Sequence, residues 1–198
     1  MGLSEPPARK RIVVAISGAS GAVYGVRMLE ALRAAPGFES HLVVSEAGWR
    51  NLRHELAMAP GDLRPLADHV HEVGDVGATI ASGSFRAAGM AVAPCSMRTL
   101  AAIASGLGDN LITRAADVML KERRRLVLMV RETPLHLVHL RNMATVTEMG
   151  GIVCPPVPAF YLRPQTVQDI VDQAVARTLD LLDVPHTLSA RWTGDPSG

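Results

Sequence analysis

Short apolar runs without polar alternation, separated by segments of helical length, most constrain how this chain folds. The runs lie at residues 11–17, 41–45, 89–93, 126–130 and 151–154, and residues 68–72 form a further candidate for a short strand. Strands of this kind are buried on both faces, as in a parallel sheet that helices cover from both sides. Helical spacing and stop signals predict helices at residues 22–35, 46–57, 96–105, 112–124, 135–149 and 166–183. The last of these carries an apolar stripe that begins at Val167.

This alternation predicts an α/β fold with a Rossmann-like (flavodoxin-like), doubly wound and mainly parallel sheet with helices on both faces. The chain has 198 residues, the size of one domain. Residues 1–10 are polar and contain two prolines, so we expect a disordered leader there and a single domain over residues 11–198. In such a fold the ligand binds at the carboxyl ends of the strands, so functional residues are expected in the loops that follow them.

Charge and composition exclude several classes of protein. Lys and Arg number 20 against 19 Asp and Glu, and this net charge of +1 argues against a nucleic-acid or polybasic membrane binder. No apolar run approaches the ~20 residues of a membrane span, and the N-terminus lacks the apolar segment of a signal peptide. Two cysteines, Cys95 and Cys154, are too few for a disulfide framework. We therefore expect a cytoplasmic protein.

Two loops after predicted strands are suited to binding an anion. Residues 18–25 (GASGAVYG) begin with five small residues and lead into a helix whose N-terminus offers N–H groups. Close strand–helix packing explains the glycines equally well. Residues 94–99 (PCSMRT) place Ser96 as a helix N-cap, with Thr99 one turn later. Ser45 ends another strand, either as a cap or as a ligand. Such loops after different strands indicate a mononucleotide site.

Several cationic residues lie at positions that fit either a functional or a purely structural role. Arg114 and Lys121 are two helical turns apart and share a face, but Asp117 between them also fits a surface ion-pair ladder. Arg131 directly follows a buried strand, which is a better position for function. Arg177 borders the apolar stripe of the last helix, where an arginine stem lying over the core is the simpler explanation.

Four further residues are candidates without a motif of their own. Tyr161 follows a proline-rich segment, and Trp192 lies in a polar tail, where a tryptophan either fixes the tail or covers a site. Glu55 and Glu132 are the carboxylates to consider for proton transfer, although most glutamates lie on the surface.

Histidines form two close pairs. His69 and His71 share one face of a strand, and His136 and His139 share one face of a helix. Neither pair has a carboxylate-rich or cysteine partner set nearby in the sequence, so we predict no metal site.

Together these stretches resemble the flavin prenyltransferases, the UbiX/Pad1 family. The matching strings lie at residues 16–22 (ISGASGA), 94–100 (PCSMRTL), 114–118 (RAADV), 120–124 (LKERR), 130–135 (VRETPL) and 155–161 (PPVPAFY), together with Arg191 and Trp192. The resemblance spans residues 11–194, which is nearly the whole chain.

The resemblance implies a flavoprotein domain that assembles as a homododecamer. It implies transfer of a dimethylallyl group from dimethylallyl monophosphate to reduced FMN, with bonds to N5 and C6 of the flavin and release of phosphate. No metal is required. The product, prenylated FMN, is used by a UbiD-type decarboxylase.

The resemblance also assigns residues to roles. FMN is expected to contact Gly18, Ala19, Ser20, Ser45, Ser96, Met97, Arg98, Thr99 and Arg131. The dimethylallyl phosphate is expected to bind Arg114, Lys121, Tyr161 and Arg177. The expected catalytic residues are Ser20, Glu55, Lys121, Glu132 and Trp192. Among these, the glutamates and the serine would move protons, the lysine would stabilise the leaving phosphate, and Trp192 would close over the prenyl group with the C-terminal tail.

Two rival functions remain open from the sequence. One is an FMN-dependent cysteine-type decarboxylase of related fold, although no histidine stands out in the loops after the strands to serve it. The other is a non-catalytic FMN carrier, or a subunit that assists a decarboxylase. That second function would leave the cations Arg114, Lys121 and Arg177 without a role.

Overall fold

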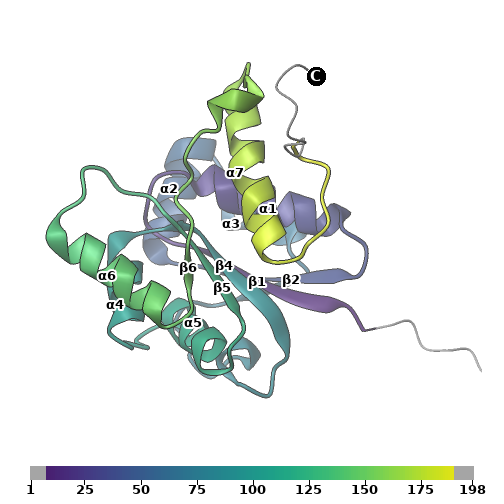
Figure 1. The fold of residues 1–198 in the computed structure, drawn as a ribbon. Helices are drawn as coiled ribbons and strands as arrows, with labels where there is room; N and C mark the ends of the chain where they lie inside the picture. The colour runs from purple at the N-terminus through teal and green to yellow at the C-terminus, as the bar shows by residue number, and fades with distance from the viewer. Residues whose placement is uncertain (1–7, 190–198) are drawn as a thin grey trace, which may run out of the picture.

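A six-stranded, all-parallel sheet forms the centre of the protein in a computed structural model that describes residues 8–189 (Figure 1). The strands are β1 (Lys10–Ile16), β2 (Phe38–Val44), β3 (His69–His71), β4 (Ala87–Cys95), β5 (Arg125–Val130) and β6 (Ile152–Val153). Their order is β3-β2-β1-β4-β5-β6, so the chain winds outward from β1 on one side and from β4 on the other. The topological switch point therefore lies between β1 and β4, where ligands bind in folds of this class.

Helices cover both faces of this sheet (Figure 1). They are α1 (Ala22–Ala34), α2 (Glu46–Leu56), α3 (Pro60–Leu63), α4 (Met97–Ala104), α5 (Leu111–Lys121), α6 (Leu137–Glu148) and α7 (Val167–Leu181). On one face Ile12 of β1 packs in a core with Leu29 of α1 and Val175 of α7. On the other face Val13 packs in a second core with Leu100 of α4 and with apolar side chains of α5. The doubly wound α/β fold is thus confirmed.

Several boundaries differ from the sequence prediction. The strand expected to close at Pro94 continues to Cys95, because Cys95 still pairs with Val130 of β5. The helix expected to reach residue 124 ends at Lys121, since Arg123 has a φ of 55°. Val167 is 78% exposed, so the apolar stripe of α7 does not begin there. No helix of the described residues is long and apolar enough to cross a membrane.

The expected leader of residues 1–10 does not extend to Lys10. Lys10 is the first residue of β1, and its N–H donates to the Gly37 carbonyl at 2.7 Å. Arg9 forms an ion pair with Asp68 at 2.7 Å. Electrostatic and backbone contacts therefore order the chain before the first apolar residue of the strand.

Gly25 sets how closely α1 approaches the sheet. A Cβ atom at this position would lie 2.5 Å from the Ala93 carbonyl oxygen and 2.5 Å from Ile16 Cγ1. Both neighbours belong to strands that carry functional loops at their carboxyl ends. Close approach at this glycine therefore fixes the start of α1 relative to those loops.

We predict that Gly25→Ala lowers the free energy of unfolding by about 1–3 kcal/mol, because overpacking outweighs the better helix propensity of alanine. Gly61→Ala is the matched control, since nothing lies within 4 Å of a Cβ atom there. Urea unfolding of both variants measures the effect. Equal stability of the two variants would contradict the packing argument.

Candidate functional site

The first part of the site is a cavity of about 540 Å³ at the carboxyl ends of β1, β2 and β4, which we call the switch-point cavity. Its volume is in the range of small-molecule and cofactor sites. Loop residues that the sequence pointed to line it, together with two arginines: Gly18, Ser45, Arg50, Ser96, Arg98 and Thr99. Parallel strands thus bring together loops that lie far apart in the sequence.

Hydroxyl groups fix the loops around this cavity. The Ser45 side chain accepts a hydrogen bond from the Gly48 N–H at 3.0 Å and caps α2. The Ser96 side chain accepts one from the Thr99 N–H at 3.3 Å and caps α4. Both residues therefore serve as the expected N-caps while they line the cavity.

Ser17, which the sequence analysis did not single out, ties two of these loops together. Its hydroxyl donates to the Pro94 carbonyl and accepts from the Ser96 N–H, both at 2.8 Å. This fully buried serine lies between strand β1 and the glycine-rich loop. The only sequence feature that could have identified Ser17 is its position as a polar residue at the end of an apolar strand.

Close packing and ligand approach both explain the glycine at position 18. A Cβ atom there would lie 2.5 Å from the Ala47 Cβ atom, so any larger residue would collide with the start of α2. Gly18 is nevertheless exposed and lines the switch-point cavity. Small residues, hydroxyls and nearby arginines are groups that fit a flavin mononucleotide, because they allow close backbone approach and bind phosphate.

Glu55 occupies the N-terminus of α1. Its carboxylate accepts hydrogen bonds from the N–H groups of Gly21 and Ala22, each at 2.9 Å. A carboxylate is stabilised there by the partial positive charge of the helix N-terminus. The expectation that these N–H groups would be free for a ligand anion is therefore wrong. The same contact places Glu55 beside the Ser20–Gly21 peptide.

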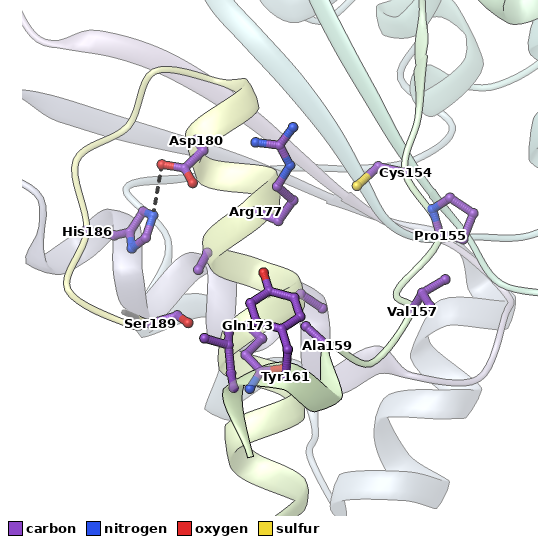
Figure 2. Close-up of a pocket in the computed structure, with 13 residues that line it drawn as sticks. Cys154, Pro155, Val157, Ala159, Tyr161, Gln173, Arg177, Asp180, His186 and Ser189 are labelled. Atoms are coloured by element: carbon purple, nitrogen blue, oxygen red, sulfur yellow. Dashed lines mark hydrogen bonds and ion pairs between the residues drawn. The ribbon is translucent and has the colours of Figure 1, made fainter. Parts of the chain in front are cut away.

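The second part of the site is a cavity of about 390 Å³ between α7 and the segment that follows β6, which we call the α7 cavity (Figure 2). It brings together Tyr161 and Arg177, two of the expected phosphate ligands. Figure 2 shows the Tyr161 hydroxyl pointing toward the side of the cavity where Arg177 lies. The buried Oε1 atom of Gln173, another lining residue, has no hydrogen-bond partner among residues 8–189. That oxygen calls for a hydrogen-bond donor, whereas the Arg177 guanidinium and the Tyr161 hydroxyl are the groups suited to a small anion.

Cys154 also lines the α7 cavity. Burial raises the pKa of this thiol, and the neighbouring Thr178 and Arg177 only partly oppose that shift. The thiol is therefore protonated at neutral pH and acts there as a small, weakly polar wall.

Arg114 and Lys121 do not join this cavity in a single chain. Both lie on α5, which packs on the face of the sheet opposite α7. Lys121 pairs with Glu122 beside Gly83, and Arg114 pairs with Asp117 at 2.6 Å. The shared helix face inferred from their spacing does not indicate which end of the sheet the helix reaches.

Lys121 also lies at the opposite end of β5 from Arg131 and Glu132. The helix ends at Lys121, just before β5 begins, whereas Arg131 and Glu132 follow the carboxyl end of β5. A six-residue strand at ~3.3 Å per residue separates these ends by about 20 Å. The predicted convergence of four cations on one anion does not occur within one subunit.

Arg131 and Glu132 stand at the carboxyl edge, as their position after a buried strand predicts. The Arg131 N–H donates to the Cys95 carbonyl at 3.1 Å, which joins this loop to the one containing Ser96. Glu132 is exposed, and its Oε1 atom accepts from the Thr133 N–H at 2.9 Å. Burial raises the pKa of Tyr24 in α1, and the charge of Arg131 opposes that shift, so Arg131 faces the start of α1.

Of the remaining expected residues, Ala19 is held by the Asn51 side chain, which donates to the Ala19 carbonyl at 2.7 Å. Met97 begins α4 and Arg98 pairs with Asp109 at the rim of the switch-point cavity. Asn51, which holds the loop of Ala19, lies in the middle of α2, so no local sequence pattern predicted this role. Trp192 and the expected covering tail lie outside the described residues.

Comparisons with known proteins decide the family. Residues 3–183 match the model of the family described as Flavoprotein. A flavin prenyltransferase UbiX of Neisseria meningitidis serogroup B is 59% identical over 93% of this chain and 97% of that protein. The chain belongs to the flavin prenyltransferase family.

Two solved structures of similar proteins agree with this membership. A UbiX (PadA1) crystal structure in complex with FMN and dimethylallyl pyrophosphate is 53% identical, with a TM-score of 0.91 over 94% of this chain and 98% of that one. A dodecameric FMN-dependent UbiX-like decarboxylase from Escherichia coli O157:H7 is 48% identical, with a TM-score of 0.90 over 93% and 100%.

Away from both cavities, this family member carries a histidine cluster on β2 and β3. His41 is buried, stacks on His69 with ring centroids 4.5 Å apart, and lies 3.0 Å from the His71 ring nitrogen. Donor atoms of Glu39, His41 and His69 lie within 4.8 Å of one another. The sequence analysis did not identify Glu39 as a carboxylate neighbour of these histidines. Glu39 already forms an ion pair with Arg11 at 2.8 Å, which disfavours binding of a metal cation.

This cluster makes stability depend on pH. Burial lowers the pKa of His41 to about 4 from the ordinary value near 6.5, and burial also lowers the pKa of His71. The unfolded chain therefore takes up these protons at higher pH than the folded chain does. Stability is complete above pH 6.5 and is lost as the pH falls toward 4.

We predict that the free energy of unfolding falls by about 2 kcal/mol between pH 7 and pH 5 because of His41. Urea unfolding at the two pH values measures this difference, which His41→Gln should largely remove. His54→Gln, at an exposed histidine of α2, is the control and should keep it. An unchanged difference in His41→Gln would show that His41 is not its source.

Proposed function

We propose that this protein is a flavin prenyltransferase. It joins a dimethylallyl group from dimethylallyl monophosphate to N5 and C6 of reduced FMN and releases phosphate, and its product serves a UbiD-type decarboxylase. The observation that carries the proposal is the presence of a mononucleotide-sized cavity and a Tyr161–Arg177 anion cavity on one chain of this family. We assign the protein to the cytoplasm, which its two unpaired cysteines support.

In the proposed complex the switch-point cavity holds FMN. Gly18, Ala19 and Ser20 would lie against it with their backbone, and Ser45, Ser96 and Thr99 would supply hydroxyls. Met97, Arg98 and Arg131 would complete its surroundings. When bound, the reduced flavin supplies the nucleophilic atoms, so the protein's task is to place them and to exclude water.

The α7 cavity would hold the phosphate of the prenyl donor. Tyr161 would donate a hydrogen bond and Arg177 would form charge-assisted hydrogen bonds to the phosphate oxygens. Negative charge grows on that phosphate as the allylic C–O bond breaks, so fixed cations stabilise the transition state more than the ground state. Four cations, Arg114, Lys121, Arg131 and Arg177, would perform the work that other prenyl transferases assign to magnesium.

We infer that Arg114 and Lys121 reach the phosphate from a second copy of the chain. In one subunit they lie on the face of the sheet opposite Arg177, as described above. The homododecamer that we propose supplies such neighbours. Exposed apolar side chains on α6 and on the segment before α7 support it, namely Leu137, Val138, Leu140, Val157 and Phe160.

Proton transfer is assigned to Glu132, Glu55 and Ser20. Glu132, at the end of β5, would protonate the departing phosphate once the closed site removes it from water. Glu55 lies beside Ser20, so the pair would accept the proton that the flavin loses. Trp192 would cover the prenyl group from the C-terminal tail.

The rival functions have weaker support. His136 does end the loop after β5, but its Nδ1 atom accepts from the Val138 N–H at 3.2 Å and caps α6. Its Nδ1 lone pair is thus used by the helix cap rather than by a thiol substrate. A flavin carrier would need no anion cavity beside Arg177.

The deciding experiment incubates the protein with reduced FMN and dimethylallyl monophosphate without oxygen, and then weighs the flavin by mass spectrometry. We expect a mass gain of one prenyl unit and release of phosphate, with or without a chelator. A parallel reaction with oxidised FMN should leave the flavin unchanged, and one with the pyrophosphate should be slower. Unchanged flavin in every reaction would leave the carrier function, and oxidation of a cysteine-type substrate would support the decarboxylase.

A complementation test checks that the phosphate site is shared. Lys121→Ala and Arg177→Ala chains, each inactive alone, are co-expressed with different tags, and assemblies that carry both tags are isolated. If one site takes each residue from a different subunit, about one quarter of the sites are intact and activity returns. If both residues act within one subunit, every site lacks one of them and the mixed assemblies stay inactive.

A further inference from the structure

A carboxylate, Asp180, lines the α7 cavity together with Arg177. Its negative charge would repel a phosphate in that cavity and would also compete with phosphate for the guanidinium of Arg177. The two residues lie three positions apart on α7, so they are neighbours on the helix surface. An anion site at Arg177 therefore depends on where the Asp180 side chain is held.

The same spacing elsewhere in the chain gives ion pairs. Arg114 pairs with Asp117 at 2.6 Å on α5, and Arg27 pairs with Glu30 at 3.0 Å on α1. Within residues 8–189, by contrast, no ion pair includes Arg177. The Asp180 Oδ1 atom instead accepts from the Nε2 atom of His186 at 3.2 Å (Figure 2). Something other than helix geometry therefore keeps Asp180 from Arg177.

His186 is well suited to hold that carboxylate. Its side chain is only 3% exposed, so the ring has little freedom to turn. Its Nδ1 atom accepts from the Leu188 N–H at 3.4 Å, which leaves the proton of a neutral imidazole on Nε2, facing Asp180. The hydrogen bond thus needs no protonated histidine.

We propose that His186 is a positioning residue that holds Asp180 away from Arg177 and thereby keeps the guanidinium available for the phosphate of the prenyl donor. The identity of that donor rests on the proposed function, whereas the anion site itself does not. Loss of His186 would remove a hydrogen bond that opposes the turn of this carboxylate toward Arg177, where it would form the kind of ion pair seen at the other two positions.

The test measures the binding of inorganic phosphate to the intact assembly by calorimetry. His186→Phe keeps a buried ring but removes the N–H, and should weaken phosphate binding about fivefold, as expected for a partly exposed ion pair that competes. The KM for the prenyl donor should rise by a similar factor with little change in kcat. His186→Gln keeps an N–H donor and should bind phosphate like the parent, and His186→Leu replaces the Phe variant if that variant does not assemble.

The double variant His186→Phe/Asp180→Asn tests whether His186 positions Asp180 or only supports the fold. An amide cannot form the competing ion pair, so phosphate binding should return to the parent level. His186→Phe with Asp172→Asn, a change on the same helix at the residue that pairs with Arg27, is the matched control and should not recover. No recovery in the Asp180 double variant, or parent-like binding in His186→Phe, would overturn the inference. Recovered binding in a protein that never prenylates FMN would instead overturn the proposed function alone.

Discussion

The parallel hydrogen bonding between β1 and β4 is the interaction on which the site depends. It sets residues 11–15 beside residues 87–92. Beyond the strands, hydrogen bonds of the Ser17 hydroxyl to Pro94 and Ser96 connect the two loops. Loops nearly eighty positions apart in the sequence thereby meet at one edge of the sheet. Because the strands pack closely on both faces, any slip in this pairing would disrupt both cores, so the loops are held as rigidly as the core.

The two layers of helices place different candidate site residues on opposite faces of the sheet. The layer with α1 and α7 supplies the cavity of Tyr161 and Arg177, and the layer with α4 and α5 supplies one wall of the switch-point cavity and the cations of α5. A single sheet cannot bring opposite faces together. A phosphate site that uses both sets of cations, as we propose, would therefore require a neighbouring subunit.

The sequence predicted the fold well because burial of whole strands leaves a simple pattern of apolar runs. It also located the loops, since Gly18, Ser45, Ser96 and Arg131 follow strands that are easy to recognise. What it could not supply is the geometry between elements. The spacing of Arg114 and Lys121 defines a helix face but not its distance from Arg177. Likewise, the contact of Glu55 with α1 joins segments more than thirty residues apart and has no local signature.

Three of the cations that we propose for the FMN and phosphate sites already form weak ion pairs. Arg98 pairs with Asp109, Arg114 with Asp117 and Lys121 with Glu122, and all six side chains are at least one-third exposed. Exposed pairs of this kind contribute only about 0–1 kcal/mol each, so a phosphate can displace the carboxylates at small cost. The N-terminus of α1 is different, because Glu55 holds two backbone N–H groups there. In the proposed reaction, side-chain cations rather than the N-terminus of α1 would therefore respond to the changing charge on the substrate.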